Sequence, residues 1–118
     1  MDADHIRDLF AELGTVHIRR MFGGAGIYAG EVMFGLVSDG LIYLKADAGT
    51  MPAFEREKCA PFQYSTKQGR RAVMSYWRLP DRLYDDPVEL AHWAKQAIAA
   101  ARQSAVKKPA AKVRTKRK

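Results

Sequence analysis

The apolar positions at the start of the chain follow two different periods. Four of them recur at the spacing of one helical face: Ile6, Leu9, Phe10 and Leu13. This spacing predicts an amphipathic helix over residues 3–13, and Gly14 is typical of a helix end. Apolar and polar positions then alternate over residues 16–22, which predicts a strand that ends at Gly23-Gly24.

Three short runs rich in β-branched and aromatic residues come next, at residues 25–29, 32–38 and 41–46. Gly30-Glu31 separates the first two runs and Asp39-Gly40 the last two. An Asp-Gly pair between apolar runs is typical of a hairpin, because a type I′ turn needs a positive φ at both central residues. The pattern predicts an antiparallel meander.

The next part of the chain predicts a short helix followed by a second hairpin. Asp47 or Thr50 can cap the helix, which is expected to stop near Cys59. The hairpin strands are predicted at residues 62–66 and 70–79, around Lys67-Gln68-Gly69. Two side chains are expected on each face of the second strand, with Val73 and Trp77 on one and Met74 and Tyr76 on the other.

A long helix is predicted from Pro87 to about Ser104. Asp86 is a suitable N-cap, proline is favoured at the first helical position, and Glu89 completes a capping box. The expected buried stripe consists of Leu90, Trp93, Ala94, Ala97, Ile98 and Ala101.

The element order is helix, three or four strands, helix, two strands, helix. It predicts an α+β fold, a two-layer sandwich in which helices cover one face of a mostly antiparallel sheet of five to six strands. We expect one domain over residues 1–104. Residues 105–118 have no apolar period and are expected to be a disordered basic tail.

Charge is distributed unevenly along the chain. The net charge of +7 equals the charge of the tail, so that residues 1–104 are formally neutral. The tail cations are Lys107, Lys108, Lys112, Arg114, Lys116, Arg117 and Lys118. Seven cations on a flexible segment can attract DNA without sequence specificity; the competing interpretation is a solubilising terminus.

No residue pattern indicates catalysis, a cofactor or a metal site. Gly24, Gly26 and Ala29 match part of a dinucleotide fingerprint, but the residues after them continue as a strand, whereas the fingerprint must open a helix. The titratable candidates for catalysis are scattered along the chain: His5, His17, His92 and the single cysteine, Cys59. Asp85-Asp86 is better explained as a turn and an N-cap than as a pair of catalytic carboxylates. We therefore expect a protein that is not an enzyme.

Arginines on the predicted strands are interleaved with aromatic residues. The candidate binding surface comprises Arg19, Arg20, Arg70, Arg71, Tyr76 and Arg78. Such a surface can bind nucleic acid, form ion pairs with the acidic residues of the body (residues 1–104), or serve as an interface with a second copy or another protein. The sequence leaves these interpretations open. A small-molecule sensor is a further alternative, with a cleft gathering Tyr28, Arg78 and a histidine.

The chain has no apolar run long enough to span a bilayer, and its acidic N-terminus differs from a secretory signal. A soluble cytoplasmic protein is expected, and one cysteine agrees with a reducing compartment.

Two strings carry a family resemblance: Arg19-Arg20-Met21-Phe22-Gly23-Gly24 and Met74-Ser75-Tyr76-Trp77-Arg78-Leu79-Pro80. With the intervening residues they resemble the N-terminal domain of the TfoX/Sxy competence regulators over about residues 5–100. The resemblance implies a secretion-chaperone-like sandwich and a bacterial cytoplasmic regulator that assists transcription of competence genes together with the cyclic-AMP receptor protein. Members of this family add a helical C-terminal domain, whereas here the last helix leads into the basic tail. The resemblance supplies no catalytic residues.

Overall fold

The computed structural model describes the backbone of residues 2–21 and 23–115, and the side chains of these residues as far as Ala105. The helices are α1 (Ala3–Leu9), α2 (Met51–Arg56), the 3-10 helix η1 (Asp81–Asp85) and α3 (Pro87–Thr115). The strands are β1 (His17–Met21), β2 (Gly24–Ala29), β3 (Val32–Ser38), β4 (Leu41–Lys45), β5 (Pro61–Thr66) and β6 (Gly69–Arg78). The predicted order is confirmed, and η1 is an element that the apolar pattern does not indicate.

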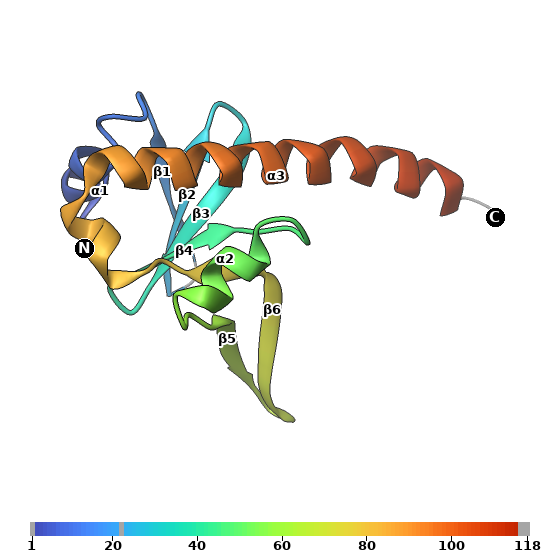
Figure 1. Ribbon diagram of the computed structural model, residues 1–118. Coiled ribbons are helices and arrows are strands. Elements are labelled where there is room, and N and C mark those ends of the chain that lie inside the picture. Colours follow the sequence, from blue (N-terminus) through green and yellow to red (C-terminus); the bar gives the residue numbers. More distant parts are fainter. Residues whose placement is uncertain (1, 22, 116–118) are drawn as a thin grey trace.

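All six strands form one antiparallel sheet in the order β1-β2-β3-β4-β6-β5. The first four strands make the predicted meander, whereas β6 pairs with β4 and so places β5 at the far edge. Figure 1 shows α3 crossing one face of the sheet. The predicted α+β class is confirmed, and the arrangement fits a two-layer sandwich.

One hydrophobic core lies between the sheet and the helices. α1 contributes Ile6, its C-cap residue Phe10 also lies in the core, and α2 contributes Phe54. The predicted stripe of α3 is confirmed, because Leu90, Ala94, Ala97 and Ala101 are buried while Trp93 and Ile98 pack against the core as half-buried residues. Burial of these side chains is the main force that holds the two layers together.

A β-bulge directs both halves of β3 toward this core. Tyr28 pairs with Met33 and Ile27 with Gly35, which leaves Phe34 as an extra residue opposite β2. The Phe34 ring is buried and meets the Phe10 ring edge to face, with 5.6 Å between centroids. Simple alternation would place Phe34 on the opposite face of the sheet from Val37, so the bulge is what brings both residues into the core.

Local signals set the turns and the start of α3 as predicted. Asp39 and Gly40 have φ values of 53° and 75°, which are the positive angles of the expected hairpin turn. The Asp86 carboxylate accepts a hydrogen bond of 3.2 Å from the backbone N–H of Glu89, which confirms the N-cap.

The ends of two helices differ from the prediction. α1 ends at Leu9 rather than residue 13, because the chain closes in turns whose N–H groups at Leu13 and Gly14 both bond to the carbonyl of Phe10. α3 continues past Ser104 to Thr115. Residues 102–115, beyond the apolar stripe, are mostly Ala, Lys and Arg, which are strong helix formers. The disorder expected for residues 105–118 stays a prediction.

The β5–β6 pairing is irregular, and this irregularity changes one predicted face. Pro61 pairs with Trp77 but Phe62 pairs with Val73, so β6 carries extra residues at this point. Residues directly opposite each other share a face, whereas the consecutive residues Pro61 and Phe62 point to opposite faces. Val73 therefore lies on the face opposite Trp77. The prediction that Val73 and Trp77 share a face is wrong, whereas the separation of Trp77 from Tyr76 is confirmed, since they pair with Leu44 and Lys45 respectively.

Beyond this irregularity the β5–β6 hairpin projects away from the rest of the molecule (Figure 1).

In the described part of the chain, no helix is long and apolar enough to cross a membrane.

Candidate binding surface

The face of the sheet opposite the core is the main candidate surface. We call it the open face and define it by strand positions whose register opposes the core positions. Its members are His17, Arg19, Met21, Gly24, Gly26, Tyr28, Met33, Leu36, Ser38, Leu41, Tyr43, Lys45, Tyr76 and Arg78. None of them is an acid, so this face combines aromatic, methionine and cationic side chains.

Gly26 shapes the centre of the open face. A Cβ atom at Gly26 would come within 2.7 Å of the Met33 sulfur, 2.9 Å of the Met21 sulfur and 3.0 Å of the Tyr28 ring. Three large side chains therefore converge over this glycine. Met21 remains 44% exposed, and methionine is a flexible side chain that adapts to different partners.

Two cations lie over tyrosine rings on this face. The Arg19 guanidinium carbon lies 5.0 Å from the centroid of the Tyr28 ring, and Lys45 Nζ lies 5.1 Å from that of Tyr76. The Tyr76 hydroxyl donates a 3.3 Å hydrogen bond to the Met33 carbonyl. Burial, with a smaller effect of Tyr28, raises the pKa of Tyr76 to about 12, so this hydroxyl stays protonated at neutral pH. Tyr76 thus acts as a fixed support for the surface.

An aromatic row leads from the open face onto the edge strand β5. The rings of Tyr43 and Phe62 meet edge to face at 4.9 Å, and the Phe62 and Tyr64 rings stack at 6.4 Å. Tyr64 is 45% exposed at the outer end of this row. Aromatic side chains supply large contact areas at low entropic cost, so the row is suited to binding.

The structure does not bring the sequence-predicted arginines together. Arg19 and Arg20 lie on β1 at one edge of the sheet, whereas Arg70 and Arg71 lie in the hairpin at the opposite edge. Arg78 forms an ion pair of 3.2 Å with Asp81. The predicted surface is therefore divided into separate groups, and its binding role stays a prediction.

Arg20 belongs to a depression of about 590 Å³ between α1, β1 and the two turns after β1 and β3. Asp2 and Asp39 supply acidic groups to its wall, and Ile6 and Ile18 supply apolar ones. Phe22, in the same segment, lies outside the described residues.

An ion-pair network that the sequence does not indicate joins three helices or their ends. Arg82 donates to both carboxylate oxygens of Glu57, at 3.1 and 2.7 Å, and to both oxygens of Glu89, each at 3.0 Å. The Trp93 indole N–H also donates to Glu89, at 3.2 Å. The hydrogen bonds from Arg82 lower the pKa of both carboxyl groups. No local signal could reveal this network, because Glu57 lies on a separate element far along the chain.

Cys59 lines a depression of about 400 Å³ beside this network, together with Arg78 and Pro80. Burial raises the pKa of the thiol, with opposing and smaller effects from neighbouring charges, so the reactive thiolate is disfavoured. Tyr28 lines a different depression, of about 350 Å³, where α3 leaves the sheet. The Tyr28, Arg78 and histidine cleft expected for a small-molecule sensor is therefore not assembled at either place.

His5, His17 and His92 are exposed on three separate elements. Among the residues whose structure is described, no group of three or more His, Cys, Asp or Glu side chains is placed to hold a metal ion. The side chains of the seven predicted tail cations lie outside the described residues.

Comparison with known proteins finds similarity over most of the chain. A family model described as the TfoX N-terminal domain matches residues 8–101. The DNA transformation protein TfoX1 of Aliivibrio fischeri is 26% identical over 102 residues, which cover 83% of this chain and 48% of that protein. Protein Sxy of Escherichia coli is 27% identical over 95 residues, which cover 80% of this chain and 45% of that protein. The chain spans about half the length of these curated relatives.

Proposed function

The chain belongs to the TfoX N-terminal domain family, and from this premise we propose that it is a competence-related regulatory domain that acts by binding a protein of the transcription machinery. The name of the Aliivibrio fischeri relative supports a connection with DNA transformation. The arrangement that carries the proposal is the open face, which bears methionine, tyrosine and arginine on a rigid sheet and no acid. Methionine, tyrosine and arginine are enriched at protein interfaces.

The proposed partners are a cyclic-AMP receptor-type protein and RNA polymerase, in the bacterial cytoplasm. Arg19 and Met21 are the anchors, because both are exposed at the centre or edge of the open face and rest on Tyr28 and Gly26. A partner that covers them removes apolar surface from water while the sheet pays little ordering entropy.

The double variant Arg19→Ala, Met21→Ala tests this role. We expect its affinity for one of the two purified partners, measured by fluorescence anisotropy of the labelled full chain, to fall at least about tenfold, since truncating an interface anchor costs more than about 1 kcal/mol. Val88→Ala is the matched control, because Val88 is 58% exposed on α3, away from the open face. Binding of neither protein by the parent chain, or equal loss in both variants, would contradict the proposal.

A second proposed role, non-specific attraction to DNA, belongs to the basic tail. Its seven cations carry the whole formal excess charge of the chain. Replacing all seven with glutamine in the full chain is expected to weaken duplex binding and to make the plot of log affinity against log salt shallower by up to about 6, at 0.9 per lost phosphate contact. Anisotropy titrations between low and physiological salt measure this slope. An unchanged slope would leave the tail with no part in DNA binding.

The alternative of an adaptor that forms a homodimer through the open face makes a different prediction for the same variants. Light scattering would then show a dimer for the parent chain and a monomer for the Arg19→Ala, Met21→Ala variant.

A further inference from the structure

The β5–β6 hairpin is a projecting arm with a charge unlike that of the rest of the body. Residues 60–80 contain no Asp or Glu but carry Lys67, Arg70, Arg71 and Arg78. The thirteen acids of the chain all lie outside this segment, in residues 2–57 and 81–89. Residues 1–104, which are neutral as a whole, therefore present one acid-free, cationic projection, which Figure 1 shows extending away from the other strands and the helices.

The three cations at the outer end of the arm, Lys67, Arg70 and Arg71, are exposed. Residues 63–72 are exposed with the single exception of Thr66, which is half-buried. No ion pair in the described part of the chain involves Lys67, Arg70 or Arg71, whereas Arg78 and Arg82 nearer the body are paired with Asp81, Glu57 and Glu89. Arg70 instead donates a hydrogen bond of 3.1 Å to the Gln63 side chain across the ribbon. Positive charge is thus left unneutralised at the outer end of the arm.

The arm ends in a tight turn that keeps it narrow. Thr66 pairs with Gly69, so Lys67 and Gln68 alone form the loop. The Thr66 hydroxyl donates a hydrogen bond of 2.7 Å to the Gly69 carbonyl and accepts one of 3.2 Å from the Gln68 N–H. Gly69 has a φ of 119°, a positive angle that glycine adopts without strain. The side chains near the turn are small on both strands, at Ser65, Thr66, Gly69 and Ala72. The end of the arm is a slender and locally braced ribbon.

We infer that this arm enters the major groove of duplex DNA with its turn first. A two-stranded ribbon fits this groove, which is about 12 Å wide and about 8.5 Å deep. At about 3.3 Å per residue, the groove depth accommodates the turn and two or three residues of each strand. Lys67 and Gln68 then reach the base edges, while Arg70 and Arg71 lie at the level of the groove rim.

The alternation of the strand gives the two arginines separate tasks. Consecutive residues of a strand point to opposite faces, so Arg70 and Arg71 face the two phosphate walls of the groove. Tyr64, directly opposite Arg71, shares its face and adds an aromatic surface against the sugar-phosphate backbone. The arm would hold DNA independently of the basic tail and of the open face.

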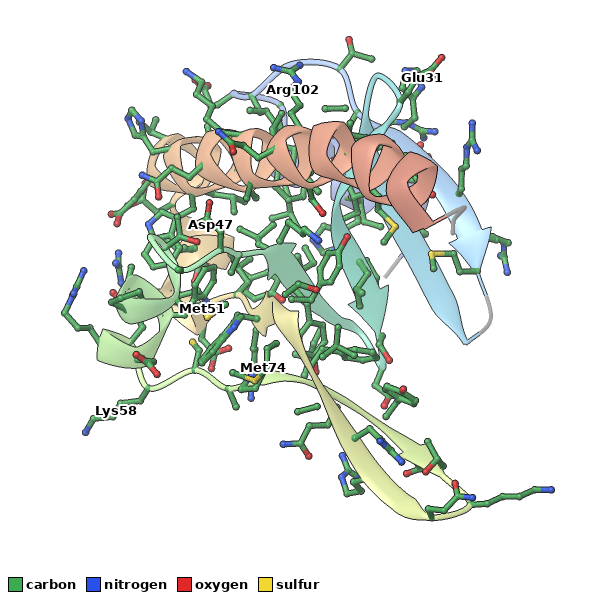
Figure 2. All side chains as sticks on the ribbon, turned by 90° about the vertical axis from the view of Figure 1, so that its right-hand side faces the viewer. Glu31, Asp47, Met51, Lys58, Met74 and Arg102 are labelled. Carbon is green, nitrogen blue, oxygen red and sulfur yellow. The ribbon has the colours of Figure 1, made fainter. Side chains whose placement is uncertain are left out.

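Titration of a 20-base-pair duplex with the full chain tests the inference. The arm variant is Lys67→Gln, Arg70→Gln, Arg71→Gln, and the charge-matched control is Arg56→Gln, Lys95→Gln, Arg102→Gln, whose members are exposed on α2 and α3. Figure 2 shows Arg102 on the opposite side of the molecule from the hairpin. Each variant is made in the parent chain and in the chain with the glutamine-substituted tail, which separates the contribution of the arm from that of the tail.

The arm variant is expected to bind roughly tenfold or more weakly at low salt in both backgrounds, with a log-log salt slope shallower by up to about 1.8 for the two phosphate contacts of Arg70 and Arg71. The control is expected to change neither quantity beyond a small general charge effect. Equal losses in the arm and control variants would overturn the inference. The inference would also be overturned if binding of a single strand of the same length, or of a polyglutamate peptide, depended on the arm while binding of the duplex did not.

Replacing guanine with 7-deazaguanine provides a readout that general charge attraction does not move, because it removes the N7 acceptor and leaves the charge of the duplex unchanged. N7 lies in the major groove, so the substituted duplex is expected to bind the parent chain more weakly than the unsubstituted duplex does. The arm variant is expected to bind both duplexes equally. A parent chain that is indifferent to this substitution would overturn entry into the groove.

Discussion

Gly24→Ala is expected to destabilise the domain by about 3 kcal/mol or more, enough to unfold a large fraction of a marginally stable chain. A Cβ atom at Gly24 would overlap the backbone carbonyl oxygen of Val37 on the neighbouring strand, with the carbonyl carbon of Val37 only 3.0 Å away. Backbone atoms of a paired strand cannot move aside as a flexible side chain can. The substitution must therefore separate β2 from β3, and both strands contribute to the core.

Gly26→Ala on the same strand is the matched control. Its Cβ would meet the ends of Met21 and Met33, which are flexible, and the edge of the Tyr28 ring. We expect a smaller loss of unfolding free energy than for Gly24→Ala, measured for both variants by urea denaturation monitored by circular dichroism. Equal losses would mean that the close approach of β2 and β3 at Gly24 does not limit stability. A larger loss for Gly24→Ala would show that the glycine-rich string has a structural role in the sheet.

Trp77→Ala is expected to cost about 3 to 5 kcal/mol, the range for removing a buried aromatic side chain. The indole is 4% exposed and lies 6.1 Å from the ring of Phe54, centroid to centroid. Its N–H donates a 2.8 Å hydrogen bond to the Met74 carbonyl, at the point where β6 passes from the body into the hairpin. The side chain thus packs in the core and also fixes the base of the projecting arm.

Met74→Ala serves as the control for Trp77→Ala, because the Met74 side chain is 51% exposed and its carbonyl group is unchanged. We expect a change within about 0.5 kcal/mol for Met74→Ala in the same denaturation experiment. Trp77→Phe should fall between the two, because it keeps an aromatic ring against Phe54 but loses the donor. Amide hydrogen exchange of residues 63–73 should accelerate in Trp77→Ala before global unfolding. Exchange that changes only with global stability would argue against a role at the base of the arm.

Two sets of cations contribute differently to the proposed functions. Arg82 is surrounded by Glu57 and Glu89 and has its pKa raised by them, so it joins helices and offers little charge to a ligand. Lys67, Arg70 and Arg71 have no acidic neighbours within their segment of sequence and lie on an exposed ribbon. The total charge of the body hides this separation, because a sum over residues contains no information on where each charge lies.

Features that depend on neighbouring residues could be predicted from the amino-acid sequence. The positive φ angles at Asp39-Gly40, the cap at Asp86 and the buried stripe of α3 all arise from contacts within a few positions of the chain, and each was predictable. The strand order of the meander was predictable for the same reason, since short turns force adjacent strands to pair.

The way in which distant segments meet depends on packing between elements. The bulge at Phe34 depends on packing against Phe10, and the irregularity between Pro61 and Phe62 depends on pairing with β6 as that strand leaves β4. The irregularity between Pro61 and Phe62 determines that Val73 faces away from Trp77. The strand order places Arg19 and Arg71 near opposite edges of the sheet, although both belong to similar arginine pairs in the sequence. The physical reason is that side-chain packing across the core selects the register. The sequence of one strand does not specify which other strand it pairs with.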